Sequence, residues 1–546
     1  MTVSRRAFFE GLLGAPLSAR LLAGCRSSPA PRVEGALLGQ SAEVGHLVRD
    51  DRQARLAHVR SLPPTRVRTV VVGGGPAGLS AAYTLARAGA DDLALLELEP
   101  EAGGTSRGGA SALTAYPWGA HYLPVPHRHN VALVSLLREM GVIVGEDEHG
   151  RMRVSEPHLV RVPEERLFYK GYWYGGLYLE AGASQDDLAQ RARFDAEVAR
   201  WVQRRDARDR RAFTLPVRLA SDDAELRELD ALPATAWLDA RGLTSPRLRW
   251  LLDYACRDDY GCRLADASAW ALLFYFASRI EDKGAPPSPL ISWPEGNFAL
   301  VRHLQSAVGA RVRTGVVALE VDERDDGVEV LAWDAREARG VRLQCAHAVV
   351  ATPRFVTSRI VRHLRDAGVE SSCRYAAWMV ANLHLHGRPA SRGVELAWDN
   401  VLHDSPSLGY VCATHQRGSD HGPTVLTYYL PLADGDPASA RARLLAGSYE
   451  SARDLVLLDL GRAHPELASL VTRLDVFRWG HAMVRPEPGQ QARTRAFAAT
   501  SPHGRVHLAH SDLSGVSLFE EAFDRGVQAA EAVLADVRPS SAEAAR

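Results

Sequence analysis

The sequence predicts an α/β fold. A β-branched, apolar run at residues 69–72 leads directly into a glycine-rich turn, GGGPAG, and then into a stretch typical of a helix that ends at Gly89. A second apolar run follows at residues 93–97. Strand, helix and strand in this order form a βαβ unit, which joins parallel strands. Later helix-like and strand-like stretches lie in separate blocks, which predicts a second domain of mixed α+β structure.

Three glycines of the turn fit G-x-G-x-x-G, and each has a physical role. Gly73 permits the tight turn, Gly75 lets the backbone approach a pyrophosphate, and Gly78 lets the helix pack close to the strand. The helix N-terminus adds unpaired N–H groups and the positive end of its dipole. The candidate dinucleotide contacts are Gly73, Gly75, Pro76, Ala77 and Gly78. A glycine turn without a ligand is the alternative interpretation.

The second strand ends in an acidic residue, Glu97, which lies 24 positions after Gly73. A carboxylate at this place accepts hydrogen bonds from both hydroxyls of an adenosine ribose, which a phosphate at the 2′ position would prevent. The first domain is therefore predicted to be of the Rossmann type, with an adenine dinucleotide as its ligand.

The residues after Glu97 resemble the flavin-containing amine oxidase superfamily. In residues 97–106, ELEPEAGGTS, a glycine pair follows the acid at the spacing of that superfamily, and residues 116–122, YPWGAHY, resemble its Gly-Ala segment near the flavin ring. By this resemblance the cofactor is FAD, and further contacts with it come from Gly103, Gly104, Thr105, Gly119 and Ala120.

The middle and the C-terminal end of the chain extend the resemblance. In the matching pattern a valine such as Val317 holds the adenine through its backbone, and Asp512 binds the ribityl chain. Ser517 and Glu520 fit S-x-x-E, a capping box that would open the final helix, with Ser517 a further cofactor contact. The N-terminus of that helix would stabilise the negative charge of reduced flavin.

The flavin motifs fall in three separated segments, so that the stretches between them would build the second domain. The first stretch is mostly helical by pattern, over 185–206 and 224–251, and opens with an aromatic run at 168–178 that is typical of a hairpin; the second reads as strands. The predicted units are a signal at 1–25, a linker at 26–65, FAD-binding segments at 66–149, 290–365 and 486–536, a helical insertion at 150–289, a strand insertion at 366–485 and a disordered tail at 537–546.

The N-terminus resembles a twin-arginine export signal. Arg5 and Arg6 precede two phenylalanines and a weakly apolar stretch, and the segment ends in LAGC, which resembles a lipoprotein processing site at Cys25. The resemblance implies export of the folded protein with its cofactor, and a lipid anchor at the periplasmic or cell-surface side of a membrane. An ordinary cleaved signal and a fortuitous arginine pair are the alternatives.

Composition is that of a globular enzyme of two or three domains. The 546 residues are 46% hydrophobic and 24% charged, with a net charge of −1, which gives no indication of a nucleic-acid partner. Cys256 and Cys262 could pair in an oxidising compartment, but five cysteines besides Cys25 argue against a disulfide framework. His384 and His386 share one face of a strand, yet no third ligand lies at metal-binding spacing, so no metal is predicted.

The catalytic residues are less clearly marked. Many amine oxidases of the superfamily carry a lysine on a strand of the substrate domain, whereas the matching strand here, residues 379–385, has none. Asp258 and Asp259 are candidates for binding a cationic amine or acting as a base, with Tyr260 beside them, although a helix cap or turn is the alternative interpretation. His481, near the C-terminal motif, is a candidate proton carrier.

The resemblance implies an FAD-dependent oxidoreductase that removes a hydride from a C–N or C–C bond of a small molecule and passes the electrons to oxygen or another carrier. Hydride transfer to a flavin needs little from the protein beyond orientation and a dry pocket. The missing lysine and the Gly-Gly-Thr variant favour a first alternative, a desaturase or protoporphyrinogen-oxidase-like enzyme for an apolar substrate. A second is a tethered flavoprotein without activity.

The export signal is testable by replacing Arg5 and Arg6 with lysine. Both residues remain cationic, so only recognition of the arginine pair is lost. We expect the variant to stay in the cytoplasm, as measured by cell fractionation, whereas unaltered export would contradict the twin-arginine interpretation.

Overall fold

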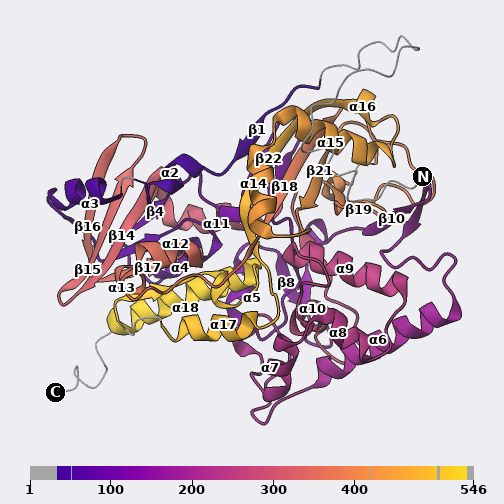
Figure 1. Ribbon diagram of the computed structural model, residues 1–546, viewed down its shortest axis with the longest axis horizontal. Coiled ribbons are helices and arrows are strands. Elements are labelled where there is room, and N and C mark those ends of the chain that lie inside the picture. Colours follow the sequence, from indigo (N-terminus) through magenta and orange to yellow (C-terminus); the bar gives the residue numbers. More distant parts are fainter. Residues whose placement is uncertain (1–32, 51, 419, 501–503, 538–546) are drawn as a thin grey trace.

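The computed structural model describes residues 33–50, 52–418, 420–500 and 504–537. The predicted signal with Cys25 and the predicted C-terminal tail from residue 538 lie outside these residues. Figure 1 shows two halves joined at the middle of the molecule: two sheets with their helices on the left, and a larger sheet above a helical bundle on the right. The fold is α/β, as predicted.

A five-stranded parallel sheet forms the centre of the first half. Its order is β13-β4-β3-β17-β23, with bounds Val312–Thr314, Leu93–Glu97, Thr69–Val72, His347–Val350 and Val506–Leu508. The strands come from all three predicted FAD-binding segments, and the predicted strand at 93–97 has the same bounds as β4. The sheet therefore assembles only when the two ends of the chain meet its middle.

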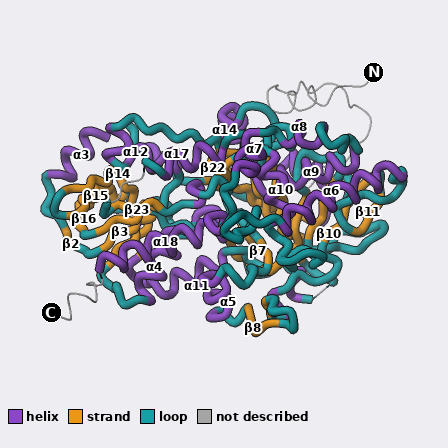
Figure 2. Tube along the Cα trace, turned by 90° about the horizontal axis from the view of Figure 1, so that it is seen from below, coloured by secondary structure: helices purple, strands orange, loops and turns teal. Residues whose placement is uncertain are grey.

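Both faces of the parallel sheet are covered, as expected for parallel strands. Alternate residues such as Val71 and Leu95 pack against α4 (Pro76–Arg87), α5 (Val131–Glu139), α11 (Phe298–Val308) and α18 (Phe519–Val537), which Figure 2 shows side by side. On the opposite face, Val70 and Leu96 pack against a second sheet of order β14-β15-β16-β2, together with residues of α12 (Arg354–Ile360) and α13 (Arg362–Asp366). The bounds of this sheet are Val316–Arg324, Gly327–Asp334, Arg339–Cys345 and Thr65–Arg66.

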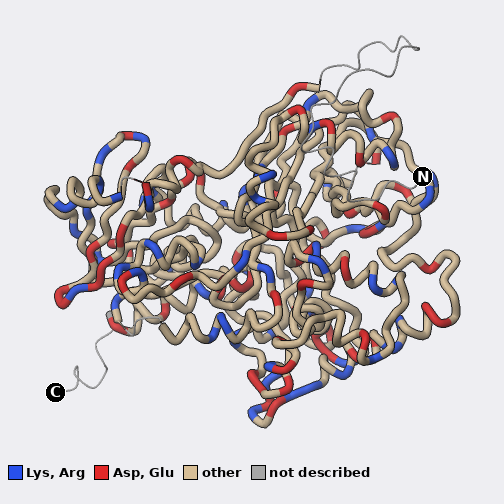
Figure 3. The backbone as a smooth tube through the Cα atoms, viewed as in Figure 1, with Lys and Arg blue, Asp and Glu red and all other residues tan. Residues whose placement is uncertain are grey.

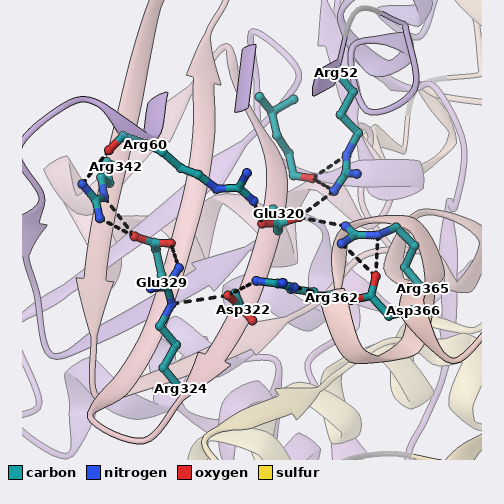
Figure 4. Close-up of polar contacts among 11 residues, drawn as sticks. Arg52, Arg60, Glu320, Asp322, Arg324, Glu329, Arg342, Arg362, Arg365 and Asp366 are labelled. Carbon is teal, nitrogen blue, oxygen red and sulfur yellow. Dashed lines mark hydrogen bonds and ion pairs between the residues drawn. The ribbon is translucent and has the colours of Figure 1, made fainter. Parts of the chain in front are cut away.

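An ion-pair network ties this second sheet to its surroundings (Figure 4). Glu320 on β14 is buried and pairs with Arg365 of α13 at 2.9 Å, with Arg52 at 3.2 Å and with Arg60 at 2.5 Å. Burial alone would raise the pKa of Glu320, but hydrogen bonds from Arg365 and Arg60 hold it below its ordinary value. Figure 3 shows basic and acidic residues interspersed over both halves, in keeping with the near-zero net charge.

An eight-stranded sheet forms the core of the second half. Its order is β1-β22-β18-β21-β20-β19-β10-β11, with bounds Leu37–Gly39, Val471–Val484, Tyr375–Leu385, Thr424–Pro431, Gly409–Cys412, Asp399–Leu402, Glu165–Tyr169 and Tyr172–Gly175. β10 and β11 form the predicted aromatic hairpin. Besides its strands, the second insertion contains α14 (Pro437–Ala446), α15 (Tyr449–Gly461) and α16 (Leu467–Leu470), which cover one face of the sheet.

Helices of the first insertion pack beneath the other face. The stretch predicted as helical over 185–206 is α6, Gln185–Gln203, whereas residues 224–251 do not form one helix. They divide among α7 (Ala224–Ala231), α8 (Ala234–Asp239) and α9 (Pro246–Tyr260), because Pro233 and Pro246 each begin a new helix. The bundle is completed by α10, Ala269–Ala277.

Residues 33–65 are not the linker that was predicted. They form β1, which pairs with β22, and then α2 (Ala42–His46), α3 (Arg52–Arg60) and β2. Leu56 and Val59 of α3 are buried against β14 and β15, so two apolar residues in a polar stretch anchor the segment. Cys256 and Cys262 are both buried and not bonded to each other. Among the described residues, no helix has both the length and the apolar character that crossing a bilayer requires.

The Glu320 network predicts a large effect of one substitution. Glu320→Gln removes a buried charge and leaves three arginines facing one another, so we expect the free energy of unfolding in urea to fall by about 2 kcal/mol, less than for a fully buried pair because Arg60 and Arg365 are partly exposed. The contribution is present above the ordinary glutamate pKa and is lost as the pH falls through the lowered value. Asp366→Asn, at an exposed pair of the same network, should cost less than about 0.5 kcal/mol. Equal losses of unfolding free energy in the two variants would contradict the central role of Glu320 in this network.

Candidate active site

The glycine-rich turn has the shape that a pyrophosphate requires. Gly73 has φ +103°, and a Cβ there would lie 2.6 Å from the Ala351 carbonyl oxygen. A Cβ on Gly78 would lie 1.8 Å from the Gly73 carbonyl oxygen, so α4 packs directly on the turn. Helix α4 begins at Pro76, with Gly75 as its N-cap, and the nearest atom to a Cβ on Gly75 is 3.9 Å away. The helix N-terminus is therefore open above Gly75.

The second glycine pair and Glu97 brace this turn. The Glu97 carboxylate accepts hydrogen bonds from the N–H of Gly74 at 2.6 Å and of Glu99 at 2.7 Å, and burial raises its pKa to about 7. Gly103 N–H donates to the Gly74 carbonyl at 2.8 Å. A Cβ on Gly104 would come within 3.2 Å of the Gly75 Cα, so the two glycine loops are in contact. The two glycine loops together make a backbone surface that fits FAD, with Glu97 bracing it from one side.

Asp512 also fits a cofactor contact. It is buried; its Oδ2 accepts hydrogen bonds from Arg354 N–H at 2.9 Å and from the Tyr375 hydroxyl at 2.5 Å. Its Oδ1 lies 3.0 Å from His510 Nδ1, which can donate to it when the imidazole is protonated and which accepts from the Asp512 N–H when the imidazole is neutral. Burial opposes ionisation, yet the interaction with His510 and these hydrogen bonds hold the pKa of Asp512 below its ordinary value.

Val317 lies in β14. Gly315, just before this strand, donates a hydrogen bond from its N–H to the Glu99 carbonyl. The Val317 side chain is buried beside α3, and its predicted contact with the adenine through the backbone stays a prediction.

A cavity of about 120 Å³ lies where the two halves meet. It brings together residues predicted from four separate segments, namely Thr105, Gly119, Ala120, Asp258, Asp259 and Ser517. Gly119 is required there because a Cβ would lie 2.1 Å from the Thr105 carbonyl oxygen. Cofactor candidates and catalytic candidates therefore share one cavity.

Apolar and aromatic side chains from the eight-stranded sheet form one wall of the cavity. Trp378 and Val380 of β18 line it together with Tyr429 of β21 and Trp479 of β22. Tyr429 stacks on His121 with ring centroids 4.6 Å apart. Pattern reading missed Trp378, Tyr429 and His121 as site residues, because buried strand residues look alike in sequence whichever face they occupy.

Two adjacent acids also line the cavity. Asp258 and Asp259 lie in the last turn of α9, inside the helix rather than in the turn of the alternative interpretation. Asp259 is buried, and Arg279 pairs with both of its carboxylate oxygens at 2.7 Å. The Tyr122 hydroxyl lies 3.3 Å from one oxygen of each aspartate. Burial and the neighbouring charge of Asp259 raise the pKa of Asp258.

Two other catalytic candidates lie away from the cavity lining. Tyr260 follows Asp258 by two residues, which turns it to the other side of α9, and its hydroxyl donates to the Ala271 carbonyl at 2.9 Å in the helical core. His481 stacks on Phe355 with ring centroids 4.3 Å apart, and burial lowers its pKa to about 4. A histidine with that pKa is neutral at pH 7 and a poor proton carrier. Arg279, which does line the cavity, had no sequence motif to mark it.

The predicted capping box is not formed as expected. Helix α18 begins at Phe519, and the Ser517 hydroxyl accepts a hydrogen bond from the Val484 N–H at 2.9 Å. On β18, Trp378 and Val380 line the cavity, whereas Asn382, which lies in the stretch 379–385 compared above with the lysine-bearing strand, is hydrogen-bonded to Pro117 and Thr427.

Comparisons with known proteins agree with this geometry. The wild-type putrescine oxidase bound to putrescine superposes with a TM-score of 0.62 at 17% identity, covering 87% of this chain and 100% of that one. Cyclohexylamine oxidase from Brevibacterium oxydans IH-35A gives 0.59 at 16% identity, covering 86% and 99%. A CLA-producing fatty acid isomerase from P. acnes gives 0.58 at 16% identity, covering 85% and 97%. A search of curated protein sequences finds no significant match.

The family comparison covers most of the chain. Residues 76–534 match the family described as flavin containing amine oxidoreductase, and they include helix α4, the residues that line the cavity and most of the C-terminal helix. The protein therefore belongs to the flavin containing amine oxidoreductase family and is an FAD-dependent oxidoreductase.

Proposed function

We propose that this protein oxidises a small, largely apolar amine that binds as its ammonium ion in the cavity. The observation that carries the proposal is that Asp258 lines the same cavity as Trp378, Val380 and Tyr429. A carboxylate faces a cation there, and apolar groups face the carbon chain. The putrescine and cyclohexylamine oxidases among the structural neighbours, both named for amines, support this class of substrate.

The charges around the cavity favour a cation. Arg279 neutralises Asp259, whereas no cation of the described residues is ion-paired with Asp258. Glu165 and Asp399 are register partners on β10 and β19, and burial raises the pKa of both. Neither is a lining residue of the cavity, but the charge of Asp258 contributes to both raised pKa values, so a cation bound beside Asp258 would relieve the repulsion among the three acids. Aromatic faces such as that of Tyr429 add a further attraction.

The residues that would hold FAD are those of the two glycine loops, Glu97 and Asp512. When bound, FAD supplies the acceptor for the hydride that the substrate loses. The chain itself orients the substrate: Asp258 and Tyr122 hold the nitrogen, and the aromatic wall excludes water from the carbon to be oxidised.

A desaturase-like reaction on an apolar substrate is the second candidate. It is favoured by the apolar side chains of Trp378 and Val380 on the strand where superfamily members carry a lysine. That lysine assists oxygen chemistry in some members, so the electron acceptor is proposed to be either oxygen or another carrier. The twin-arginine and Cys25 motifs support a place of action outside the cytoplasm, on a membrane surface.

The amine proposal is tested by anaerobic titration of the flavin absorption band. We expect small amines to bleach the band of the wild-type protein, with binding that strengthens as rising pH ionises Asp258. Asp258→Asn removes the charge but keeps the shape, and should raise the apparent Kd at least about tenfold, or 1.4 kcal/mol. Bleaching only by lipophilic dihydro-compounds would instead support the second candidate, and no bleaching by any compound an inactive flavoprotein.

The role of Asp512 is tested by flavin content. Asp512→Ala should reduce the FAD that co-purifies with the protein, measured by absorbance, without unfolding the chain as judged by circular dichroism. Tyr375→Phe is the matched control, because it removes one hydrogen bond to Oδ2 and keeps the carboxylate. Full flavin retention by Asp512→Ala would refute this role.

A further inference from the structure

A second, smaller cavity adjoins the first one. Pro124, Leu215, Arg279 and Glu520 line both. Beyond them, the second cavity is lined by four polar residues, namely His127, Asn130, Ser278 and Ser288, and by Val125 and Pro126. Its volume of about 10 Å³ is close to the space that one water molecule needs. The substrate cavity therefore adjoins a small chamber of mixed polar and apolar lining, and Glu520 lines both.

Glu520 is a buried acid without a partner. It lies in the first turn of α18 and is only 5% exposed. Apart from its own backbone N–H, no group of the described residues is hydrogen-bonded or ion-paired with its carboxylate. The neighbouring acids differ, since Asp259 is held by Arg279 and Glu521 accepts a hydrogen bond from the Val217 N–H at 2.7 Å. A buried carboxyl left unpaired at the meeting point of two cavities points to a ligand or a proton.

We propose that Glu520 is the catalytic base that takes one proton from the ammonium group of the bound substrate and releases it through the second cavity. The inference rests on the amine oxidation proposed above. In this step an N–H bond of the substrate breaks and an O–H bond forms on Glu520, which converts the ammonium and the carboxylate into a neutral amine and a carboxylic acid. No electrons change hands. The neutral amine keeps the nitrogen lone pair that assists loss of a hydride from the adjacent carbon.

The other acids of the cavity are placed less well for this task. Asp259 is neutralised by the bidentate contact with Arg279. Asp258 lies 3.3 Å from the Tyr122 hydroxyl, and it lines the first cavity but not the second. Of the three, only Glu520 has the second cavity behind it, where His127 and Asn130 offer polar atoms for a water. A proton accepted by Glu520 thus has a route away from the substrate.

The surroundings of Glu520 suit proton exchange near neutral pH. Burial raises its pKa to about 7, and the charge of Arg279 opposes this while Glu521 and Asp259 reinforce it. The other titratable groups that line the two cavities are Asp258, Tyr122, Tyr429, His121 and His127. Burial lowers the pKa of His121 to about 4 and that of His127 to about 3, so both histidines are neutral at pH 7. A base with a pKa near the working pH is the most effective one.

Stopped-flow reduction of the flavin by an amine tests the proposal. At neutral pH, Glu520→Gln should slow the limiting rate of reduction about 100-fold, the usual share of a general base. Above the amine's own pKa of about 10, where the substrate is already neutral, the defect should shrink to within about threefold. Asp258→Asn should instead weaken binding of the amine. A defect of Glu520→Gln that is independent of pH, or no defect, would overturn the proposal.

Infrared spectroscopy tests the same residue without any substrate. The wild-type holoenzyme should show a protonated carboxyl band that titrates near pH 7, exchanges in D2O and is lost in Glu520→Gln but kept in Glu521→Gln. If the difference between wild type and Glu520→Gln holds no such band, the proposal is refuted. If the band is present but no amine reduces the wild-type flavin, the proposed function fails while Glu520 remains an exchangeable proton site. Melting temperature and flavin content of each variant exclude a folding defect as the cause.

Discussion

The contact between α4 and α18 is the constraint on which the arrangement of this protein depends. A Cβ on Gly526 of α18 would lie 2.0 Å from both the Ala77 carbonyl oxygen and the Ser80 hydroxyl oxygen of α4. The Ser80 hydroxyl donates to the Phe523 carbonyl at 3.0 Å, which fixes the two helices side by side. Helix α4 begins in the glycine-rich turn, and α18 contains Glu520. This contact therefore fixes the position of the cofactor cradle relative to the cavity.

Burial then determines the chemistry of the cavity. Asp258 and Glu520, which line it, have raised pKa values because the folded protein removes water from them, so that a proton or a bound cation stabilises each of them. Arg279 is ion-paired with Asp259, and its charge opposes the raised pKa of Asp258 and Glu520 only in part. In the proposed step, an amine that enters as an ammonium ion compensates the charge of a carboxylate until it gives its proton to Glu520, which links substrate binding to proton release.

The parts of the fold governed by local sequence could be predicted. The glycine turn, the strand ending at Glu97 and α6 follow from residues adjacent in sequence, and Asp258 and Asp259 were placed in the site by their residue types alone. Features that depend on contacts between distant parts of the chain could not be predicted. Arg279 is defined by its pairing with Asp259, α3 by its packing on β14 and β15, and Tyr260 by the helix phase that turns it away from Asp258. Helix phase and strand face depend on tertiary packing, which one sequence does not reveal.

The most direct test of the central claim is a crystal structure of the FAD-loaded protein with a small amine that cannot be oxidised. The account predicts that the nitrogen lies within hydrogen-bonding distance of Asp258 or Glu520, with the carbon chain against Trp378, Val380 and Tyr429. An amine that binds with its nitrogen toward that aromatic wall, or outside the cavity, would contradict it.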